Sequence, residues 1–136
     1  MPMNSFSKQF EFLSGFAKQQ LSLHEGFHPI ASIMSVDGVL QPLAAYTGSE
    51  HPQAADLIAE YNKTIGELAQ KGTIVAAAIC VNSTSIGSNK MADIIVFEIE
   101  NAAGEAATIT LPYTKDHERI EYGELSVHQR DPHWFR

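Results

Sequence analysis

The sequence predicts an α+β domain built on a mostly antiparallel central sheet, with its elements in the order α-β-β-α-β-β-β-β. Two long stretches carry apolar residues at helical spacing, which indicates two helices. The remaining elements are short apolar runs bounded by turn residues, which is typical of strands. Most consecutive strands are joined by hairpin-length connections, so the helices are expected on the faces of an antiparallel sheet.

Residues 4–25 form the first predicted helix, because their apolar residues recur at helical spacing and Gly26 follows the last turn. Phe12, Phe16 and Leu23 lie beside the main apolar stripe, so the apolar arc covers about half of the circumference. One sheet face does not need so wide an arc. Either the helix is wedged between the sheet and the C-terminal tail, or it also contacts a second subunit.

A β-hairpin is predicted next, with strands at residues 27–36 and 39–46. The Asp-Gly pair at 37–38 is a strong hairpin signal, since glycine tolerates positive φ. Pro29 and Pro42 cannot donate ladder hydrogen bonds, so we expect them at strand starts, bulges or an outer edge.

A second helix is predicted at residues 49–71, with Gly72 at its end. Its apolar residues share an arc of about 100°, and charged residues occupy the opposite side. The apolar set is Ala54, Leu57, Ile58, Tyr61, Ile65 and Leu68. This pattern indicates a surface helix that covers a sheet.

The second half of the chain reads as strands. Residues 73–81 are apolar without alternation, which suits a strand covered on both faces, and 82–91 read as a polar loop. After the next two strands, 114–119 read as a charged loop and 120–127 as a single last strand.

The strands at 92–100 and 105–113 allow a prediction of register. A three-residue loop at 102–104 pairs Ile99 with Ala107 and Phe97 with Ile109, which places apolar residues on one face. Gly104 then takes the left-handed position of a bulged turn.

Composition limits the class of protein. The length of 136 residues indicates one α/β domain, with an N-terminal helix region at 1–26 and a C-terminal tail at 129–136. The net charge of the chain is -7. An acidic chain without a basic run is a poor nucleic-acid binder. The single Cys80 excludes a disulfide framework and a Cys-rich zinc site. We expect a cytoplasmic protein without a cofactor, a metal or a membrane anchor.

Several short motifs follow one another in a suggestive order. They are Phe27-x-Pro29, Asp37-Gly38, the Ala-rich run at 76–80, Asp93 through Glu98, Leu111-Pro112-Tyr113 and Tyr122-Gly123-Glu124-Leu125. Over residues 27–125 the chain resembles a family of small uncharacterised bacterial proteins. That resemblance implies no activity and no catalytic residue. By analogy of fold alone, the element order looks like the profilin-like or roadblock-type sandwich.

Carboxylates and tyrosines supply the candidate binding residues. Glu98 and Glu100 point away from the apolar face of their strand, and Tyr113, Tyr122 and Glu124 follow on the next strands. Two carboxylates in a pocket can divide acid and base roles, although glutamates on a solvated strand face are ordinary.

Histidines near the C-terminus do not establish a metal site, because nothing in the sequence defines their geometry. The aromatic tail residue Trp134 either packs back on the first helix or anchors a partner.

The function expected from this sequence is a non-enzymatic protein-interaction or regulatory domain that acts as a homodimer. The expected interface comprises Phe12, Phe16 and Leu23, together with Trp134. The alternative is a small-molecule-binding protein or hydrolase-like enzyme that uses the acidic and tyrosine residues of the sheet face.

Overall fold

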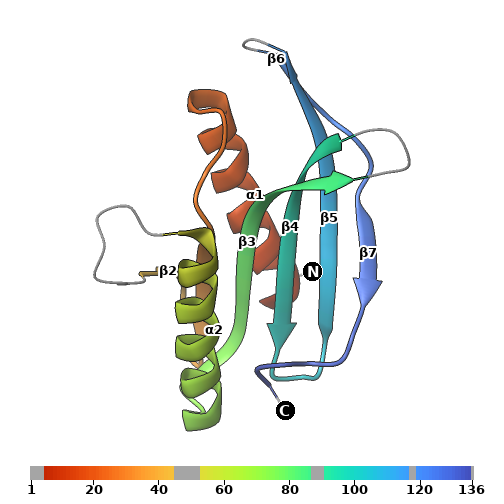
Figure 1. Ribbon diagram of the computed structural model, residues 1–136. Coiled ribbons are helices and arrows are strands. Elements are labelled where there is room, and N and C mark those ends of the chain that lie inside the picture. The colour runs from red at the N-terminus through yellow and green to blue at the C-terminus, as the bar shows by residue number, and fades with distance from the viewer. Residues whose placement is uncertain (1–4, 45–52, 87–90, 117–118, 136) are drawn as a thin grey trace.

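The computed structural model of the chain describes residues 5–44, 53–86, 91–116 and 119–135 (Figure 1). Its helices are α1 (Ser5–Leu23) and α2 (Ala54–Lys71), and its strands are β1 (Ile30–Ser35), β2 (Leu40–Leu43), β3 (Ile74–Ile86), β4 (Met91–Asn101), β5 (Ala106–Asp116), β6 (Arg119–Tyr122) and β7 (Ser126–Gln129). The predicted start of the first helix at residue 4, the predicted end of the second strand at residue 46 and the predicted start of the second helix at residue 49 lie outside the described residues.

The strands form one seven-stranded sheet with the order β2-β1-β3-β4-β5-β6, and β7 also pairs with β5. All of the strand pairs are antiparallel. The predicted fold class is confirmed: a hairpin, a helix and a strand meander build one central sheet in an α+β sandwich.

The predicted register of the β4–β5 hairpin is confirmed. Ile99 pairs with Ala107 and Phe97 with Ile109, and Gly104 has a φ of 95°. The side chain of Asn101 strengthens the turn, because its Oδ1 accepts hydrogen bonds from the backbone N–H groups of Ala103 (3.1 Å) and Glu105 (3.0 Å).

Two predicted loops are wrong in extent. β3 continues to Ile86 and pairs with β4 as far as Met91, so most of the expected 82–91 loop is strand. β5 likewise continues to Asp116. Both segments are polar because they belong to ends of long strands, where the apolar alternation that marks a core strand is not required.

The single last strand predicted at 120–127 is also wrong, because it is divided into β6 and β7 along the same edge of β5. Tyr113 faces Tyr122, whereas Thr110 faces Ser126, so the outer strand contains one extra residue in a bulge. A Cβ on Gly123 would lie 2.9 Å from Cγ of Pro112, so the bulge requires the close approach that glycine permits.

Different elements cover the two faces of the sheet. α1 packs on one face, with a core of Leu13, Ala17, Leu21, Ala78, Cys80, Ile95, Phe97, Ile99, Ile109, Leu111 and Tyr113. α2 and the C-terminal tail lie on the other face, with a core of Ala31, Ile33, Leu57, Tyr61, Ile65, Ile74, Ala77, Ile79 and Trp134. Figure 1 shows α2 in front of the β1–β3 side of the sheet and α1 behind it.

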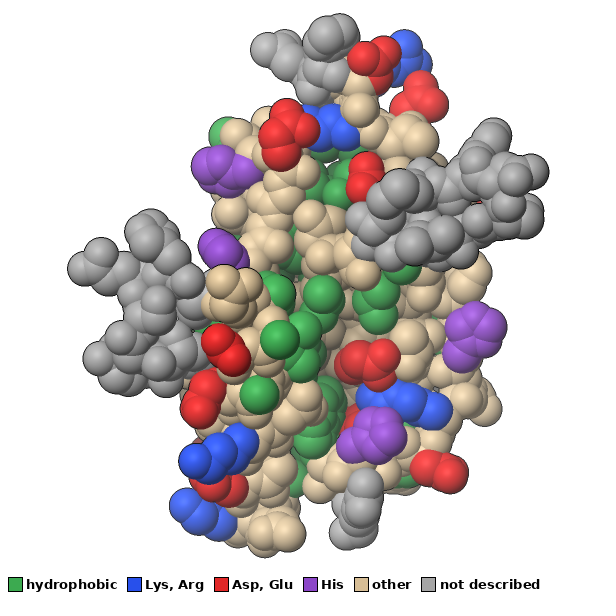
Figure 2. Space-filling model, viewed as in Figure 1, with side chains coloured by type: hydrophobic (Ala, Val, Ile, Leu, Met, Phe, Trp, Pro, Cys, Tyr) green, Lys and Arg blue, Asp and Glu red, His purple; other side chains and the backbone are tan. Residues whose placement is uncertain are grey.

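The face that carries α2 is only partly covered by this helix. α2 lies over β3 and the neighbouring hairpin, and the tail crosses the lower end of β4. Figure 2 shows hydrophobic side chains between α2 and a cluster of charged and histidine side chains near the tail. Val81 on β3 packs against the core beside α2, and Val96 on β4 is half-buried.

Candidate functional site

One flank of α1 is apolar and accessible. Phe16 keeps 37% of its surface exposed and Leu23 keeps 66%, while Phe12 on the same side is half-buried against the core. We call these three residues the α1 flank. A large exposed hydrophobic patch usually marks an interaction site, so the structure places these three predicted interface residues at an accessible surface.

An apolar groove lies beside the α1 flank. It has a volume of about 120 Å³, and its lining comes from α1, β1, β2 and α2. The lining residues are Phe12, Leu13, Phe16, Ile30, Ala31, Pro42, Leu43 and Tyr61. A groove next to an exposed phenylalanine gives this surface both a protrusion and a hollow.

Polar contacts hold α1 in place on the sheet. Fully buried Ser32 donates a hydrogen bond to Oε1 of fully buried Gln9. Nζ of Lys115 donates to the carbonyl oxygens of Leu21 (2.8 Å) and His24 (2.7 Å), where α1 ends. The α1 flank is therefore presented by a helix anchored in its N-terminal half and at its C-terminal end.

The tail does not cover the α1 flank, which corrects one interpretation of the wide apolar arc. Trp134 is buried in the core beside α2, on the opposite face of the sheet. Its Nε1 donates a hydrogen bond of 2.9 Å to Oδ1 of Asn62. The expectation that Trp134 packs on α1 is wrong, and the 8% of its surface that stays exposed gives a partner little to contact.

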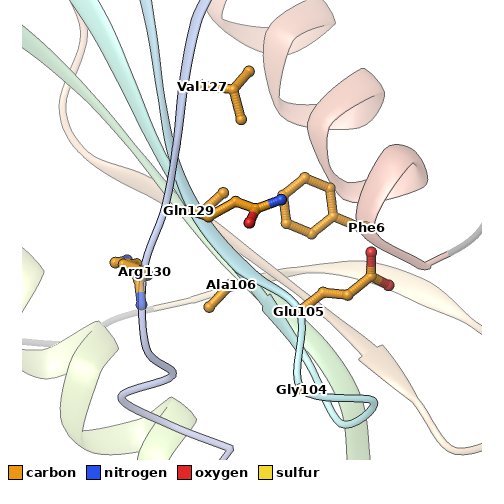
Figure 3. A pocket seen from close by; sticks show the side chains of 8 residues that line it. Phe6, Gly104, Glu105, Ala106, Val127, Gln129 and Arg130 are labelled. Atoms are coloured by element: carbon orange, nitrogen blue, oxygen red, sulfur yellow. The ribbon is translucent and has the colours of Figure 1, made fainter.

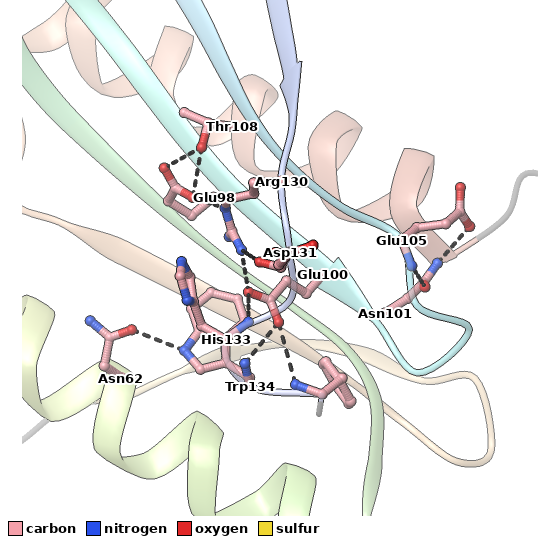
Figure 4. Close-up of polar contacts among 11 residues, drawn as sticks. Asn62, Glu98, Glu100, Asn101, Glu105, Thr108, Arg130, Asp131, His133 and Trp134 are labelled. Atoms are coloured by element: carbon pink, nitrogen blue, oxygen red, sulfur yellow. Dashed lines mark hydrogen bonds and ion pairs between the residues drawn. The ribbon is translucent and has the colours of Figure 1, made fainter.

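Glu98 and Glu100 meet at Arg130 (Figure 4). Nε of Arg130 lies 2.7 Å from Glu98 Oε2, and Nη1 lies 2.6 Å from Glu100 Oε2. Glu98 also accepts hydrogen bonds from the hydroxyl of Thr108. The predicted face of both glutamates is confirmed, but Glu100 is fully buried under the tail instead of solvated.

Glu100 also accepts hydrogen bonds from the backbone N–H groups of His133 (2.8 Å), Trp134 (2.8 Å) and Phe135 (3.3 Å). Burial by itself raises the pKa of Glu100, but the hydrogen bonds from Arg130 and from these backbone groups outweigh burial and lower it. A general acid at neutral pH needs a raised pKa. This carboxylate is suited to fastening the tail.

Tyr113 and Tyr122 lie on the α1 face, opposite to Glu98 and Glu100. Their ring centres are 6.3 Å apart, and burial raises the pKa of each phenol. Glu124 is exposed in the bulge between β6 and β7. The structure therefore does not bring the predicted carboxylates and tyrosines together in one site.

The thiol of Cys80 is also unsuited to catalysis. Cys80 is fully buried, and burial raises the pKa of its thiol, which disfavours the nucleophilic thiolate. No group of three or more His, Cys, Asp or Glu residues within the described ranges is arranged to hold a metal ion. Neither described helix is long and apolar enough to cross a membrane.

Sequence reasoning missed the central role of Arg130. A signal existed, because Arg130 follows β7 on the same side of the strand as His128. His128 pairs with Thr108, which pairs with Glu98, so all of these side chains share one face of the sheet. That assignment needs the β5–β7 register, which depends on the bulge at Gly123. The simple alternation of a continuous strand gives the wrong side.

A comparison of the chain with protein-family models, with curated proteins and with solved structures found no match. The functional inference therefore depends on the geometry described above.

Proposed function

We propose that this chain is a non-enzymatic protein-interaction or regulatory domain that works as a homodimer through the α1 flank. The observation that carries the proposal is the exposed pair Phe16 and Leu23 beside an apolar groove, on the face that the tail leaves free. A two-fold axis brings such a surface against its own copy, so that Phe16 of each subunit enters the groove of the other. We also propose a cytoplasmic location, where the thiol of Cys80 would stay reduced.

The separation of the carboxylates from the tyrosines argues against the alternative, a ligand-binding protein or hydrolase. Glu100 has a lowered pKa, and its oxygens accept hydrogen bonds from backbone N–H groups of the tail. Tyr113 and Tyr122 lie on the other face of the sheet. An acid–base pair needs both groups within reach of one substrate.

Light scattering of Phe16→Glu tests the proposal. Burying a phenylalanine side chain stabilises a complex by about 1.5–3 kcal/mol, and a two-fold dimer contains this contact twice. A loss of about 3 kcal/mol or more corresponds to a dimer dissociation constant raised about a hundredfold. We expect a dimer for the wild type at micromolar concentration and a folded monomer for the variant.

Val36→Glu is the matched control, because Val36 is 59% exposed in the β1–β2 turn and lies outside the α1 flank and its groove. It adds the same charge and should remain dimeric. A wild-type protein that is monomeric at high concentration would contradict the proposal.

A further inference from the structure

The outer edge of β7 is unpaired among the described residues. β7 forms its ladder with β5 on one side, and all four of its residues are exposed. The exposed residues include Val127, with 58% of its surface accessible, and Leu125 just before the strand is 48% exposed. Figure 1 shows β7 at the margin of the sheet.

The hydrogen-bonding pattern between β5 and β7 identifies which backbone N–H and C=O groups of β7 point away from the sheet. The N–H of Arg130 donates to the carbonyl of Ala106 over 3.1 Å, so Arg130 and the alternate residues Ser126 and His128 face β5. Val127 and Gln129 then direct their N–H and C=O groups away from the sheet. Two donors and two acceptors are available for another strand.

The two edges of the sheet differ in how they are protected. Both edge strands have four residues, but β2 contains Pro42, which has no N–H to donate. An edge proline is a common device against unwanted strand pairing. β7 contains no proline and no lysine, so this edge remains competent to pair.

Two hollows line the α1 face of this edge. One has a volume of about 320 Å³ and lies between Phe6, Val127 and Gln129. Figure 3 shows the side chain of Gln129 pointing toward the ring of Phe6, while Arg130 points away. The other has a volume of about 440 Å³ and lies between Phe10, Ile109 and Leu125. Alternate side chains of an added strand would point to this face.

The charge around the edge is acidic. Glu124 precedes β7, Asp131 follows it, and Glu105 lines the first hollow; all three are exposed. Arg130 is already paired with Glu98 and Glu100, and the chain carries a net charge of -7. An arriving segment with lysine or arginine near its ends would be attracted to these carboxylates.

We propose that the β7 edge binds an extended, basic segment of a partner protein by β-strand addition. Backbone hydrogen bonds from Val127 and Gln129 provide affinity, and the two hollows receive alternate side chains of the segment, with the hollow beside Leu125 the more apolar of the two. This proposal goes beyond self-association through the α1 flank, because it concerns the opposite margin of the sheet and a different partner.

The probe is a fluorescein-labelled nine-residue peptide in which valine alternates with threonine and lysine stands at both ends. We expect saturable binding by fluorescence anisotropy, with the amides of Val127 and Gln129 becoming protected from hydrogen exchange. Replacing the lysines by glutamates should weaken binding about tenfold or more. The peptide N-methylated at every residue cannot form the ladder and should not bind.

Val127→Pro removes one outward N–H without removing a hydrogen bond to β5, and it should weaken binding about tenfold or more. Val127→Thr keeps that N–H and the β-branched shape, and it should bind within about twofold of the wild type. Phe16→Glu should bind the peptide normally, which separates this proposal from the proposed homodimer.

Equal binding of the N-methylated peptide would overturn strand addition. Protection of Val127 and Gln129 that rises with protein concentration in the absence of peptide would show that a second copy occupies the edge, and would also overturn the proposal.

Discussion

At the scale of single residues, Glu100 fastens the end of the chain to the C-terminal end of β4. Removing a carboxylate from water costs several kcal/mol, which only good hydrogen bonds offset. Glu100 accepts such bonds from Arg130 and from the N–H groups of His133, Trp134 and Phe135. One side chain on β4 therefore contacts four residues at the end of the chain.

Glu100→Gln should destabilise the protein by about 3–5 kcal/mol, since the neutral amide leaves Arg130 and a tail N–H without a full acceptor. Glu98→Gln is the matched control on the same strand and the same arginine. The side chain of Glu98 is 32% exposed, so its loss should cost only about 1 kcal/mol. Urea unfolding measures both, and equal losses would contradict the fastening role.

The pH dependence of stability follows from the lowered pKa of Glu100. A group with a lowered pKa in the folded state stabilises the protein above its ordinary pKa, about 4.3 for glutamate, and this contribution is lost as the pH falls. The wild type should therefore lose more stability than Glu100→Gln as the pH falls from about 6 to about 3. The same unfolding series tests this, and parallel curves would contradict it.

The sequence predicts the orientation of these glutamates but not their burial. Strand alternation places Glu98 and Glu100 opposite to Phe97 and Ile99, as the β4–β5 register confirms. Burial of Glu100 depends on tail residues that are 33 to 35 positions away. No local pattern encodes such a distant contact.

At the scale of elements, the β4–β5 hairpin could be predicted in detail because its signals are local. Apolar alternation determines which residues share a face, and the loop length then determines the pairing. The outer strand could not be predicted in this way. Its bulge interrupts the alternation at Gly123, and that position is explained only by the approach of Pro112.

Gly104→Val should destabilise the hairpin more than Ala103→Val. Gly104 has a φ of 95°, where a β-branched residue is strained by about 1–3 kcal/mol. Ala103 lies next to it, is exposed and does not share this positive φ, so its substitution should cost less than about 1 kcal/mol. Thermal unfolding of the two variants compares them directly, and equal midpoints would show that the turn relaxes without strain.

At the scale of the whole molecule, the wide apolar arc of α1 was open to two interpretations, and the placement of the tail removes one of them. The tail lies on the α2 face, so it cannot cover Phe16 or Leu23. Glu100, Asn62 and the core beside α2 together hold the tail on this face of the sheet. The sequence predicts an extra apolar surface, and the fold shows that the described part of the chain leaves Phe16 and Leu23 exposed.

Trp134→Ala tests this division of the two faces. Trp134 is 8% exposed among residues of α2 and the sheet, so truncating it should cost about 3–5 kcal/mol and should increase hydrogen exchange in α2. Phe135→Ala, at a half-buried neighbour, should cost less. Because Trp134 is on the opposite face from the α1 flank, light scattering should give the same oligomeric state for this variant as for the wild type wherever it is folded. If Trp134→Ala kept its stability but no longer self-associated, Trp134 would be part of the interface between subunits.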